Sequence, residues 1–471
     1  MKNSKWLSAA LAGAVLVAGG AGSVLATSSS VSAASVKAAV TTGTGNWSVD
    51  GASSTFSTIN SNGYKLYALS EVAGALGAKL VAGANGYELN DSKGLHTVHI
   101  QVGAKSYSVD GAAQSFTVAP VIYNGKTYVE LTKTVNALGG ELDAASTSIL
   151  SFARPEGSYD TLVWTADGAL LANKSDAETT QIYKFTTHPG NYDLFTSNSS
   201  AVDVAVSPDQ QWGAFSDENG QLKLINLSTG AVSSLGTDTS VKVDYTWSAD
   251  GKTLYFLMGD KQEKIGKISV ETGALTTLLD DKVENKSEVR VSADDKKLVY
   301  IVNVTGTAKN DADSTEDSLT VDYSNAAEQI YSLDLATKDA KPVALTTALD
   351  NKLYPEILSN GAVVYLSADA DGTAPNTLKS ISADKTINAI ATDVEVFWST
   401  AAGDGLVVAG TATDGSTAVY SISASGAKTE LFHSSDDVSE VAVSKDGSKL
   451  AIISDGKVEV VQGGKVLTLT K

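Results

Sequence analysis

The chain has 471 residues, which is too long for one ordinary core and predicts several domains or a repeat array. A formal net charge of −19 argues against nucleic acid and anionic membrane surfaces as partners, and leaves cationic partners and divalent ions open. The chain contains no cysteine, which excludes disulfides, thiolate metal sites and a catalytic thiol. Abundant Val, Thr, Ser, Gly, Asp and Asn are typical of short β-strands joined by turns.

The first residues have the pattern of an export signal. Lys2 and Lys5 precede an apolar run from Trp6 to Ala26, and small residues follow it. We therefore expect a secretory signal peptide over residues 1–34 and a secreted or envelope-associated protein. Three positions fit cleavage: Ala26, Ala33 and Ala34. A retained membrane anchor is the alternative, because the apolar run is just long enough to span a bilayer.

A flexible spacer is expected over residues 35–44, and two copies of one unit follow it. WSVDG at 47–51 matches YSVDG at 107–111, and the NG…ALGAKL segment at 62–80 matches NG…ALGGEL at 124–142. In each copy, apolar residues spaced as on one helix face end at a glycine, and an Asn-Gly hairpin turn precedes the strand that leads into the helix. The pattern predicts a small α+β domain over residues 45–153, made of two β-β-α-β copies.

These motifs resemble the copper amine oxidase N-terminal-like domain, a duplicated module of secreted bacterial proteins with the signature NGxxYVPL…ALGA. The chain departs from that signature at its Pro, which is replaced by Ala68 and Glu130, and at the following Arg, replaced by Ser70 and Thr132. The resemblance implies an accessory stalk that carries neither copper nor a quinone cofactor.

The rest of the chain, residues 158–471, repeats one pattern: an extended segment, a turn such as S-x-D-G, and three further short strands. The repeated segments begin at Trp164, Val206, Trp247, Val291, Ile357, Trp398 and Val443. Their period of about forty residues, with one longer interval, predicts a seven-bladed β-propeller with one insertion. In the second repeat we expect strands over Trp212–Ser216 and Gln221–Leu227, joined by a tight turn with both Asn219 and Gly220 at positive φ.

The S-x-D-G turn, the I-Y-x-x-D/S third strand and the closing L-T resemble TolB-like propeller repeats, relatives of the WD repeats. Such propellers serve as binding platforms, receptors and non-catalytic partners of enzymes, so the resemblance implies a fold more than an activity. Trp164, Trp247 and Trp398 share one place at the end of the first strand. We interpret them as packing residues; sugar stacking is the alternative.

The insertion, Thr305 to Ala327, lies between the second and third strands of the fourth repeat. Its carboxylates make calcium the one metal worth considering, and the candidate ligands are Asp311, Asp313, Glu316 and Asp317. The segment lacks the glycine that an EF-hand loop requires at its sixth position, so a solvated loop is the preferred interpretation. Asp369 and Asp371 in the next repeat form a similar, equally weak pattern.

Enzyme signatures are sparse. Asn191-Tyr192-Asp193 matches the tripeptide in which copper amine oxidases form topaquinone, but copper there needs an H-x-H pair and a third histidine. The histidines are His96, His99, His188 and His433, and none of them form such a pair. No G-x-S-x-G elbow of a serine hydrolase is present. A propeller glycosidase with two carboxylates at the axis stays open, because carboxylates are numerous.

We therefore predict a mainly β, exported, non-catalytic binding or scaffold protein without a cofactor, in which one propeller face contacts an envelope protein or a cell-wall glycan. We expect a monomer that binds neither nucleic acid nor, after signal cleavage, membrane. The alternative is a secreted propeller enzyme that acts on carbohydrate.

Overall fold

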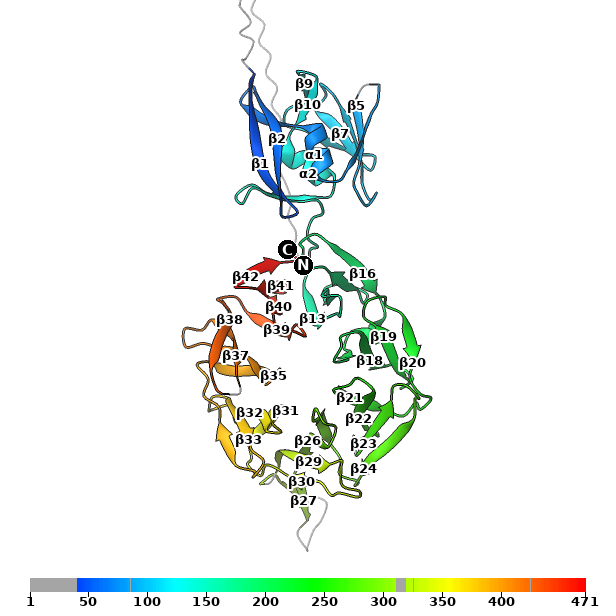
Figure 1. Ribbon diagram of the computed structural model, residues 1–471, viewed down its shortest axis with the longest axis vertical. Coiled ribbons are helices and arrows are strands. Elements are labelled where there is room, and N and C mark those ends of the chain that lie inside the picture. The colour runs from blue at the N-terminus through cyan, green and yellow to red at the C-terminus, as the bar shows by residue number, and fades with distance from the viewer. Residues whose placement is uncertain (1–39, 85, 311–318, 325, 424) are drawn as a thin grey trace, which may run out of the picture.

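The computed structural model describes residues 40–84, 86–310, 319–324, 326–423 and 425–471. The expected signal peptide and its three cleavage positions lie outside these residues. The described chain is mainly β, with a small first part and a succession of short sheets arranged around a common centre (Figure 1). Within this part of the chain, no helix has the length and apolarity needed to cross a membrane.

The first part contains two sheets and two short helices. The seven-stranded sheet has the order β11-β12-β1-β2-β3-β10-β9. Its strands are β1 (Thr41–Val49), β2 (Ala52–Ser61), β3 (Tyr64–Ala68), β9 (Val121–Tyr123), β10 (Lys126–Val129), β11 (Glu141–Asp143) and β12 (Ser148–Leu150). The five-stranded sheet contains β4 (Lys79–Ala82), β5 (Gly86–Asn90), β6 (Thr97–Gln101), β7 (Ser106–Val109) and β8 (Ala112–Ser115) in chain order. The helices are α1 (Leu69–Ala75) and α2 (Leu131–Ala137).

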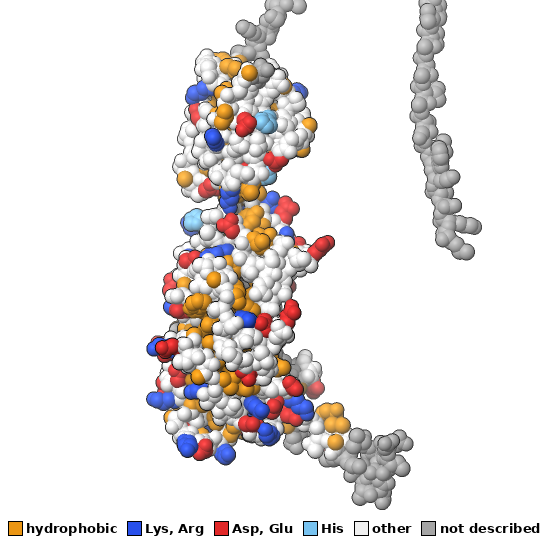
Figure 2. All heavy atoms as spheres, turned by 90° about the vertical axis from the view of Figure 1, so that its right-hand side faces the viewer, with side chains coloured by type: hydrophobic (Ala, Val, Ile, Leu, Met, Phe, Trp, Pro, Cys, Tyr) orange, Lys and Arg blue, Asp and Glu red, His pale blue; other side chains and the backbone are white. Residues whose placement is uncertain are grey.

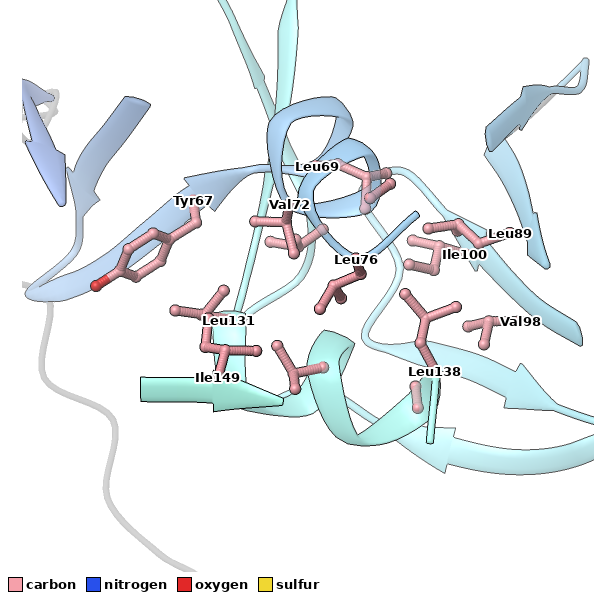
Figure 3. Packing of buried hydrophobic residues seen from close by; sticks show 14 of the residues in the cluster. Tyr67, Leu69, Val72, Leu76, Leu89, Val98, Ile100, Leu131, Leu138 and Ile149 are labelled. Atoms are coloured by element: carbon pink, nitrogen blue, oxygen red, sulfur yellow. The ribbon is translucent and has the colours of Figure 1, made fainter. Parts of the chain in front are cut away.

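Local sequence accounts for these turns and helix ends. The hairpin turns Asp50-Gly51, Asn62-Gly63, Asp110-Gly111 and Asn124-Gly125 have positive φ at both residues, as a type I′ turn requires. Gly77 and Gly139 follow the two helices with φ of 66° and 76°, which confirms their predicted role in ending them. The helices pack between the two sheets, where Leu76 and Leu138 meet Leu89, Val98 and Ile100 (Figure 3).

Two expectations about this domain need correction. Strand β1 begins at Thr41, inside the stretch expected to be a flexible spacer, because Thr41 to Thr44 pair with β2. The second copy also differs from the first: the segment equivalent to β2 is divided between β8 in one sheet and β9 in the other. Pro120, which cannot donate a ladder hydrogen bond, lies between them.

Seven four-stranded antiparallel sheets follow in the described chain, and we number them first to seventh. The first three contain β13 (Tyr159–Trp164), β14 (Leu170–Lys174), β15 (Ile182–Phe185), β16 (Tyr192–Thr196); β17 (Ala205–Val206), β18 (Trp212–Ser216), β19 (Leu222–Asn226), β20 (Val232–Ser234); β21 (Lys242–Trp247), β22 (Thr253–Met258), β23 (Lys264–Ser269) and β24 (Leu275–Asp280). The fourth and fifth contain β25 (Lys286–Val291), β26 (Lys297–Val304), β29 (Ala327–Asp334), β30 (Val343–Ala344); β31 (Asn351–Ile357), β32 (Val363–Ala368), β33 (Thr377–Ile381) and β34 (Ile387–Ala389). The last two contain β35 (Glu395–Ala402), β36 (Gly405–Thr411), β37 (Thr417–Ile422), β38 (Lys428–Ser434); β39 (Val438–Val443), β40 (Lys449–Ser454), β41 (Lys457–Gln462) and β42 (Lys465–Thr468). A 3₁₀ turn, η1 (Ser199–Ala201), precedes β17.

The first strands lie next to the common centre, as the labels β13, β21, β31, β35 and β39 show in Figure 1. Apolar residues of neighbouring sheets interlock, so that each interface is a small core. The first sheet packs in the same way against the seventh, where Trp164 and Phe185 meet Ala451 and Val460.

Two details of the repeat differ from the prediction. Trp164 pairs with Leu170 and Trp247 with Leu254, near the start of the second strand. In the sixth sheet Ala401 holds the equivalent place, opposite Leu406. Trp398 lies three residues earlier and is half-buried, because β35 and β36 extend further before they turn. In the Asn219-Gly220 turn of the second sheet only Gly220 has positive φ. The Asp217 carboxylate holds this turn by accepting the backbone N–H groups of Asn219 and Gln221.

The insertion of the fourth sheet is more ordered at its ends than a solvated loop. Strands β27 (Thr307–Asn310) and β28 (Leu319–Asp322) pair as an antiparallel hairpin, which we call the arm. The two β-branched residues of the second strand, Thr320 and Val321, favour this pairing. The four calcium candidates, Asp311, Asp313, Glu316 and Asp317, lie outside the described residues.

The two parts of the molecule meet at the segment that joins them. Arg154 makes a bidentate ion pair with Glu141, with Nη2 to Oε1 at 2.6 Å and Nε to Oε2 at 3.2 Å. Lys93 of the first domain has its Nζ 4.6 Å from the centre of the Phe152 ring and 3.8 Å from Asp193 of the first sheet. These contacts hold the small domain against the first sheet.

Candidate functional site

The two ends of the sheets form two faces with different connections. Because each sheet is antiparallel, the loops that join second to third strands and those that lead into the next sheet lie at one end. We call this end the arm face, since the arm lies between the second and third strands of the fourth sheet. The S-x-D-G turns and the loops between third and fourth strands lie at the opposite end, which we call the turn face.

A cavity of about 520 Å³ lies among the first strands of the second to fourth sheets, toward the arm face. Its lining includes the polar side chains of Asp203, Asp244 and Arg290 and the apolar side chain of Val243. Ser216 and Tyr245 share a hydrogen bond of 2.7 Å in its wall. Concave polar sites of this size at the centre of a fold can receive a small molecule or a side chain of a partner.

One equivalent position, three residues before the residue that aligns with Trp247, supplies most of the central carboxylates. In the order of the sheets its occupants are Thr161, Asp203, Asp244, Glu288, Tyr354, Trp398 and Glu440. Thr161, Asp244, Glu288 and Tyr354 have φ between 51° and 57°, at a bulge of the strand. The shared conformation shows that these positions are structurally equivalent.

The carboxylates at this position link neighbouring sheets. Asp244 of the third sheet accepts the backbone N–H of Glu288 in the fourth at 2.7 Å. Glu440 of the seventh sheet accepts the N–H groups of Thr161 and Leu162 in the first, at 2.7 and 2.6 Å. These charge-assisted bonds give the carboxylates a structural role at the sheet interfaces.

Glu288, Arg290 and Glu356 form an ionic cluster between the fourth and fifth sheets. The Nε of Arg290 lies 3.4 Å from Glu356, and its Nη2 lies 3.9 Å from Glu288. Burial raises the pKa of Glu288 to about 7, against the opposing effect of Arg290 and with a further increase from the Asp244 charge. Burial also raises the pKa of Glu356, although Arg290 opposes the change. A carboxyl group beside a second carboxylate, with its pKa near neutrality, can hold or release a proton at physiological pH.

Three buried lysines stand at the start of consecutive first strands. Lys242, Lys286 and Lys352 have fully buried side chains, each paired with an aspartate: Asp238, Asp281 and Asp350. Each ammonium group also donates to a backbone carbonyl of the loop that enters its strand. The buried ammonium groups therefore hold the arm-face loops in place, as a bound cation would.

The aspartates of the repeated turns serve the turns themselves. The hydroxyls of Ser248, Ser292 and Ser444 donate to the aspartate two residues later, at 2.7 to 2.8 Å. Asp369, noted in the sequence as a weak cation candidate, accepts the N–H groups of Thr373 and Ala374. These carboxylates act as turn acceptors.

Two of the four histidines pair with a nearby carboxylate in the small domain. His96 is hydrogen-bonded to Asp110 at 2.8 Å, and His99 lies 3.8 Å from Glu88 on the five-stranded sheet. Among the described residues there is no group of three or more His, Asp and Glu side chains arranged to hold a metal ion. Tyr192 of the Asn191-Tyr192-Asp193 tripeptide packs against Tyr183 and Phe185 and faces Lys93 of the first domain.

Sequence reasoning missed the central carboxylates and the buried lysines. The central position carries different residue types in different sheets, so it produces no motif. The lysines do leave a signal, since each follows an aspartate by two to five residues just before a first strand. The same spacing of aspartate and lysine is common in solvated loops, so it does not by itself indicate a buried pair.

Comparison with known proteins gives one match to a family model and many to solved structures. No curated protein matches the chain. The tricorn protease structure is 10% identical with a TM-score of 0.47, over 88% of this chain and 45% of that one. An oligogalacturonate lyase in complex with manganese is 13% identical with a TM-score of 0.46, over 67% of this chain and 86% of that one. TolB from Acinetobacter baumannii is 13% identical with a TM-score of 0.36, over 74% of this chain and 77% of that one. Structural neighbours thus include TolB and other propeller-like proteins, and residues 48–149 match the model of the copper amine oxidase N-terminal domain.

Proposed function

We propose that the seven sheets are the blades of one closed propeller. The indole Nε1 of Trp247 donates to the carbonyl oxygen of Ala205 in the preceding sheet at 2.9 Å. Trp164 makes the same bond, at 3.1 Å, to Ala442 of the seventh sheet. Because Ala205 and Ala442 are equivalent residues of their first strands, the first and seventh sheets meet as two consecutive sheets do. This repetition supports closure without exchange of strands.

We propose that the protein is an exported, non-catalytic binding protein of the cell envelope or the extracellular space, in which the propeller is the binding domain. The observation that carries this proposal is the cavity of about 520 Å³ at the arm-face end of the centre. It brings residues of several sheets together, next to loops that are free to vary without disturbing the interfaces between blades. The first domain would act as a stalk that presents the propeller, since Lys93 pairs with Asp193 of the first blade and Glu141 pairs with Arg154 of the joining segment.

A carbohydrate-active enzyme is the second candidate, and one observation favours it. The pKa of Glu288 is raised to about 7 beside Asp244, the arrangement in which one carboxyl group can act as a general acid and another as a base or nucleophile. Against it, Asp244 already accepts the Glu288 N–H, and Glu288 faces Arg290 of its own strand. We therefore rank this candidate second.

One experiment separates the two functions. The chain without residues 1–34 is incubated with cell-wall sacculi and with envelope extract, and sedimentation or capture is measured while glycosidase and amine oxidase substrates are screened. Retention by one envelope fraction without turnover supports the binding protein. Turnover of a glycan that Glu288→Gln abolishes, with thermal unfolding unchanged, would assign the protein to the enzymes.

A further inference from the structure

We propose that the arm face docks a basic, amphipathic polypeptide segment of a partner protein. This inference rests on the proposed binding function and names the surface and the chemistry of the partner. It is argued from the exposed apolar side chains of the face, the charges around them and the central cavity.

Exposed apolar side chains lie at the start of the first strands of three consecutive blades, and one of them lines the cavity. Val241, Val283 and Leu349, which precede the first strands of the third, fourth and fifth sheets, are 45%, 42% and 52% exposed. Val243 is 37% exposed and lines the cavity itself. The first strands of these three sheets are in contact, β21 with β25 and β25 with β31, so the four side chains belong to one region. We call these four residues the apolar rim.

The arm continues this region outward. Val321 and Tyr323 at the end of its second strand are 44% and 68% exposed, and the arm stands away from the stacked sheets with hydrophobic side chains on it (Figure 2). An exposed tyrosine beside aliphatic side chains is typical of contact surfaces, since its ring supplies apolar area and its hydroxyl a polar contact. The buried lysines hold the loops of the rim in place, which limits the entropy lost on binding.

Charge distinguishes the arm face from the turn face. Exposed carboxylates occur around the arm face: Asp176, Glu178, Asp203, Glu218, Asp260, Asp371, Asp414, Asp436, Asp437 and Asp455. Three exposed lysines lie among them: Lys261 and Lys282 are paired with Glu284 and Asp280, and Lys457 follows Asp455 in the seventh sheet. The turn face instead mixes its aspartates with exposed lysines: Lys252, Lys296, Lys338, Lys341, Lys385 and Lys445.

A ligand complementary to the arm face therefore combines positive charge with apolar groups. A polypeptide segment with lysine or arginine near leucine or valine meets both requirements, because its cations face the carboxylates while its apolar side chains cover the rim. A basic side chain can also enter the cavity toward Asp203 and Asp244. Nucleic acid and anionic lipid would meet repulsion from the same carboxylates.

The test uses the full chain without residues 1–34 and a fluorescein-labelled peptide of alternating Lys and Leu, followed by anisotropy. The matched comparison is a charge change of equal size on each face: Asp260→Asn with Asp371→Asn on the arm face, Glu271→Gln with Asp339→Asn on the turn face. We expect the arm-face pair to weaken binding about three- to tenfold, the range for two exposed ion pairs, and the turn-face pair to leave it unchanged. An equal effect of the two pairs, or none from either, would overturn the proposal.

A second comparison tests the apolar component. Val283→Ser with Leu349→Ser removes part of the rim, whereas Val232→Ser with Ile387→Ser removes similarly exposed side chains from outer strands. We expect about tenfold weaker binding from the first pair only, and weak binding of peptides with Glu/Leu or Lys/Ser alternation. A Glu/Leu peptide that binds as tightly as Lys/Leu would contradict the inference. If no envelope fraction retains the parent chain in the sedimentation assay, the result would instead contradict the proposed function. The two failures are therefore distinguishable.

Discussion

The indole Nε1 of Trp164 donates a hydrogen bond of 3.1 Å to the carbonyl oxygen of Ala442, across 278 residues of sequence. The bond joins the first of the seven described four-stranded sheets to the last, and it repeats the bond from Trp247 to Ala205 within the array. A long-range contact of the same form as a local one is what closure of a repeat array requires, because every interface then has the same geometry.

In the closed propeller that we propose, Trp164 is as important for stability as Trp247. Both indoles are nearly fully buried, so we expect Trp164→Ala and Trp247→Ala each to lower the free energy of unfolding by ~3–5 kcal/mol. Trp164→Phe keeps most of the packing and should cost about 1 kcal/mol for the lost hydrogen bond. Urea unfolding measures these differences. A Trp164→Ala variant as stable as the parent would show that the first and seventh sheets do not form a closing interface.

Glu288 should make the protein less stable as the pH rises. Its pKa of about 7 in the folded state exceeds the ordinary value of 4.5, so between these pH values the folded protein holds a proton that the unfolded chain has lost. This contribution to stability is complete below pH 4.5 and is lost as the pH passes about 7. We expect Glu288→Gln to raise stability at pH 8 by on the order of 2 kcal/mol and to change it little at pH 5.

The measurement for Glu288 is the melting temperature as a function of pH, with Glu271→Gln as the exposed control. Glu356 and Glu440 also have raised pKa values, so the variant should lose only part of the pH dependence. An unchanged pH profile in Glu288→Gln would contradict the assignment of this proton.

Removal of the buried ammonium of Lys352 should strongly destabilise the folded protein. Its Nζ donates to the Ala348 and Asp350 carbonyl oxygens at 2.5 Å and lies 3.0 Å from the Asp350 carboxylate. Lys352→Met would remove the donor to the Asp350 carbonyl oxygen and the cation closest to the buried Asp350 carboxylate, at a cost of about 3–5 kcal/mol. The exposed Lys338→Met variant should unfold like the parent. Similar stability of the two variants, by thermal unfolding, would show that solvent replaces the ammonium.

Gly190 controls the contact between the small domain and the propeller. It has φ of 77°, and a Cβ added there would lie 2.1 Å from the carbonyl oxygen of Phe152. Gly190→Ala should therefore displace the joining segment and speed its cleavage in limited proteolysis. Gly415→Ala is the matched control, since Gly415 also has positive φ but no neighbour near the added Cβ. Equal cleavage of the two variants would argue against a fixed joint.

Much of the fold could be predicted because turns carry strong local signals. Asn62-Gly63 and the repeated S-x-D-G turns require particular residues. The glycines that end α1 and α2 adopt the positive φ that favours glycine at a helix C-terminus. The prediction was wrong where tertiary context decides. Trp398 was expected to end its strand, but β35 extends four residues further, and Thr41 was expected in a spacer although it pairs with β2.

The candidate site could not be predicted in the same way. Asp244 and Glu288 are separated by 44 residues and meet only because two bulged strands bring equivalent positions together. Burial also gives Glu288 its unusual pKa, and neither burial nor the Arg290 contact has a signature in the sequence. The division into an acidic arm face and a mixed turn face follows from strand order, which becomes visible once the four-stranded sheets are known.

Site-specific crosslinking tests the central claim, a binding protein that acts through its arm face, most directly. The chain contains no cysteine, so Asp371→Cys on the arm face and Asp339→Cys on the turn face each provide a unique attachment point for a photoactivatable benzophenone. Both proteins are illuminated with envelope extract, and adducts are identified by mass spectrometry. We predict one defined polypeptide adduct from the arm-face position and none from the turn-face position. An adduct from the turn face alone, or none from either position, would contradict the account.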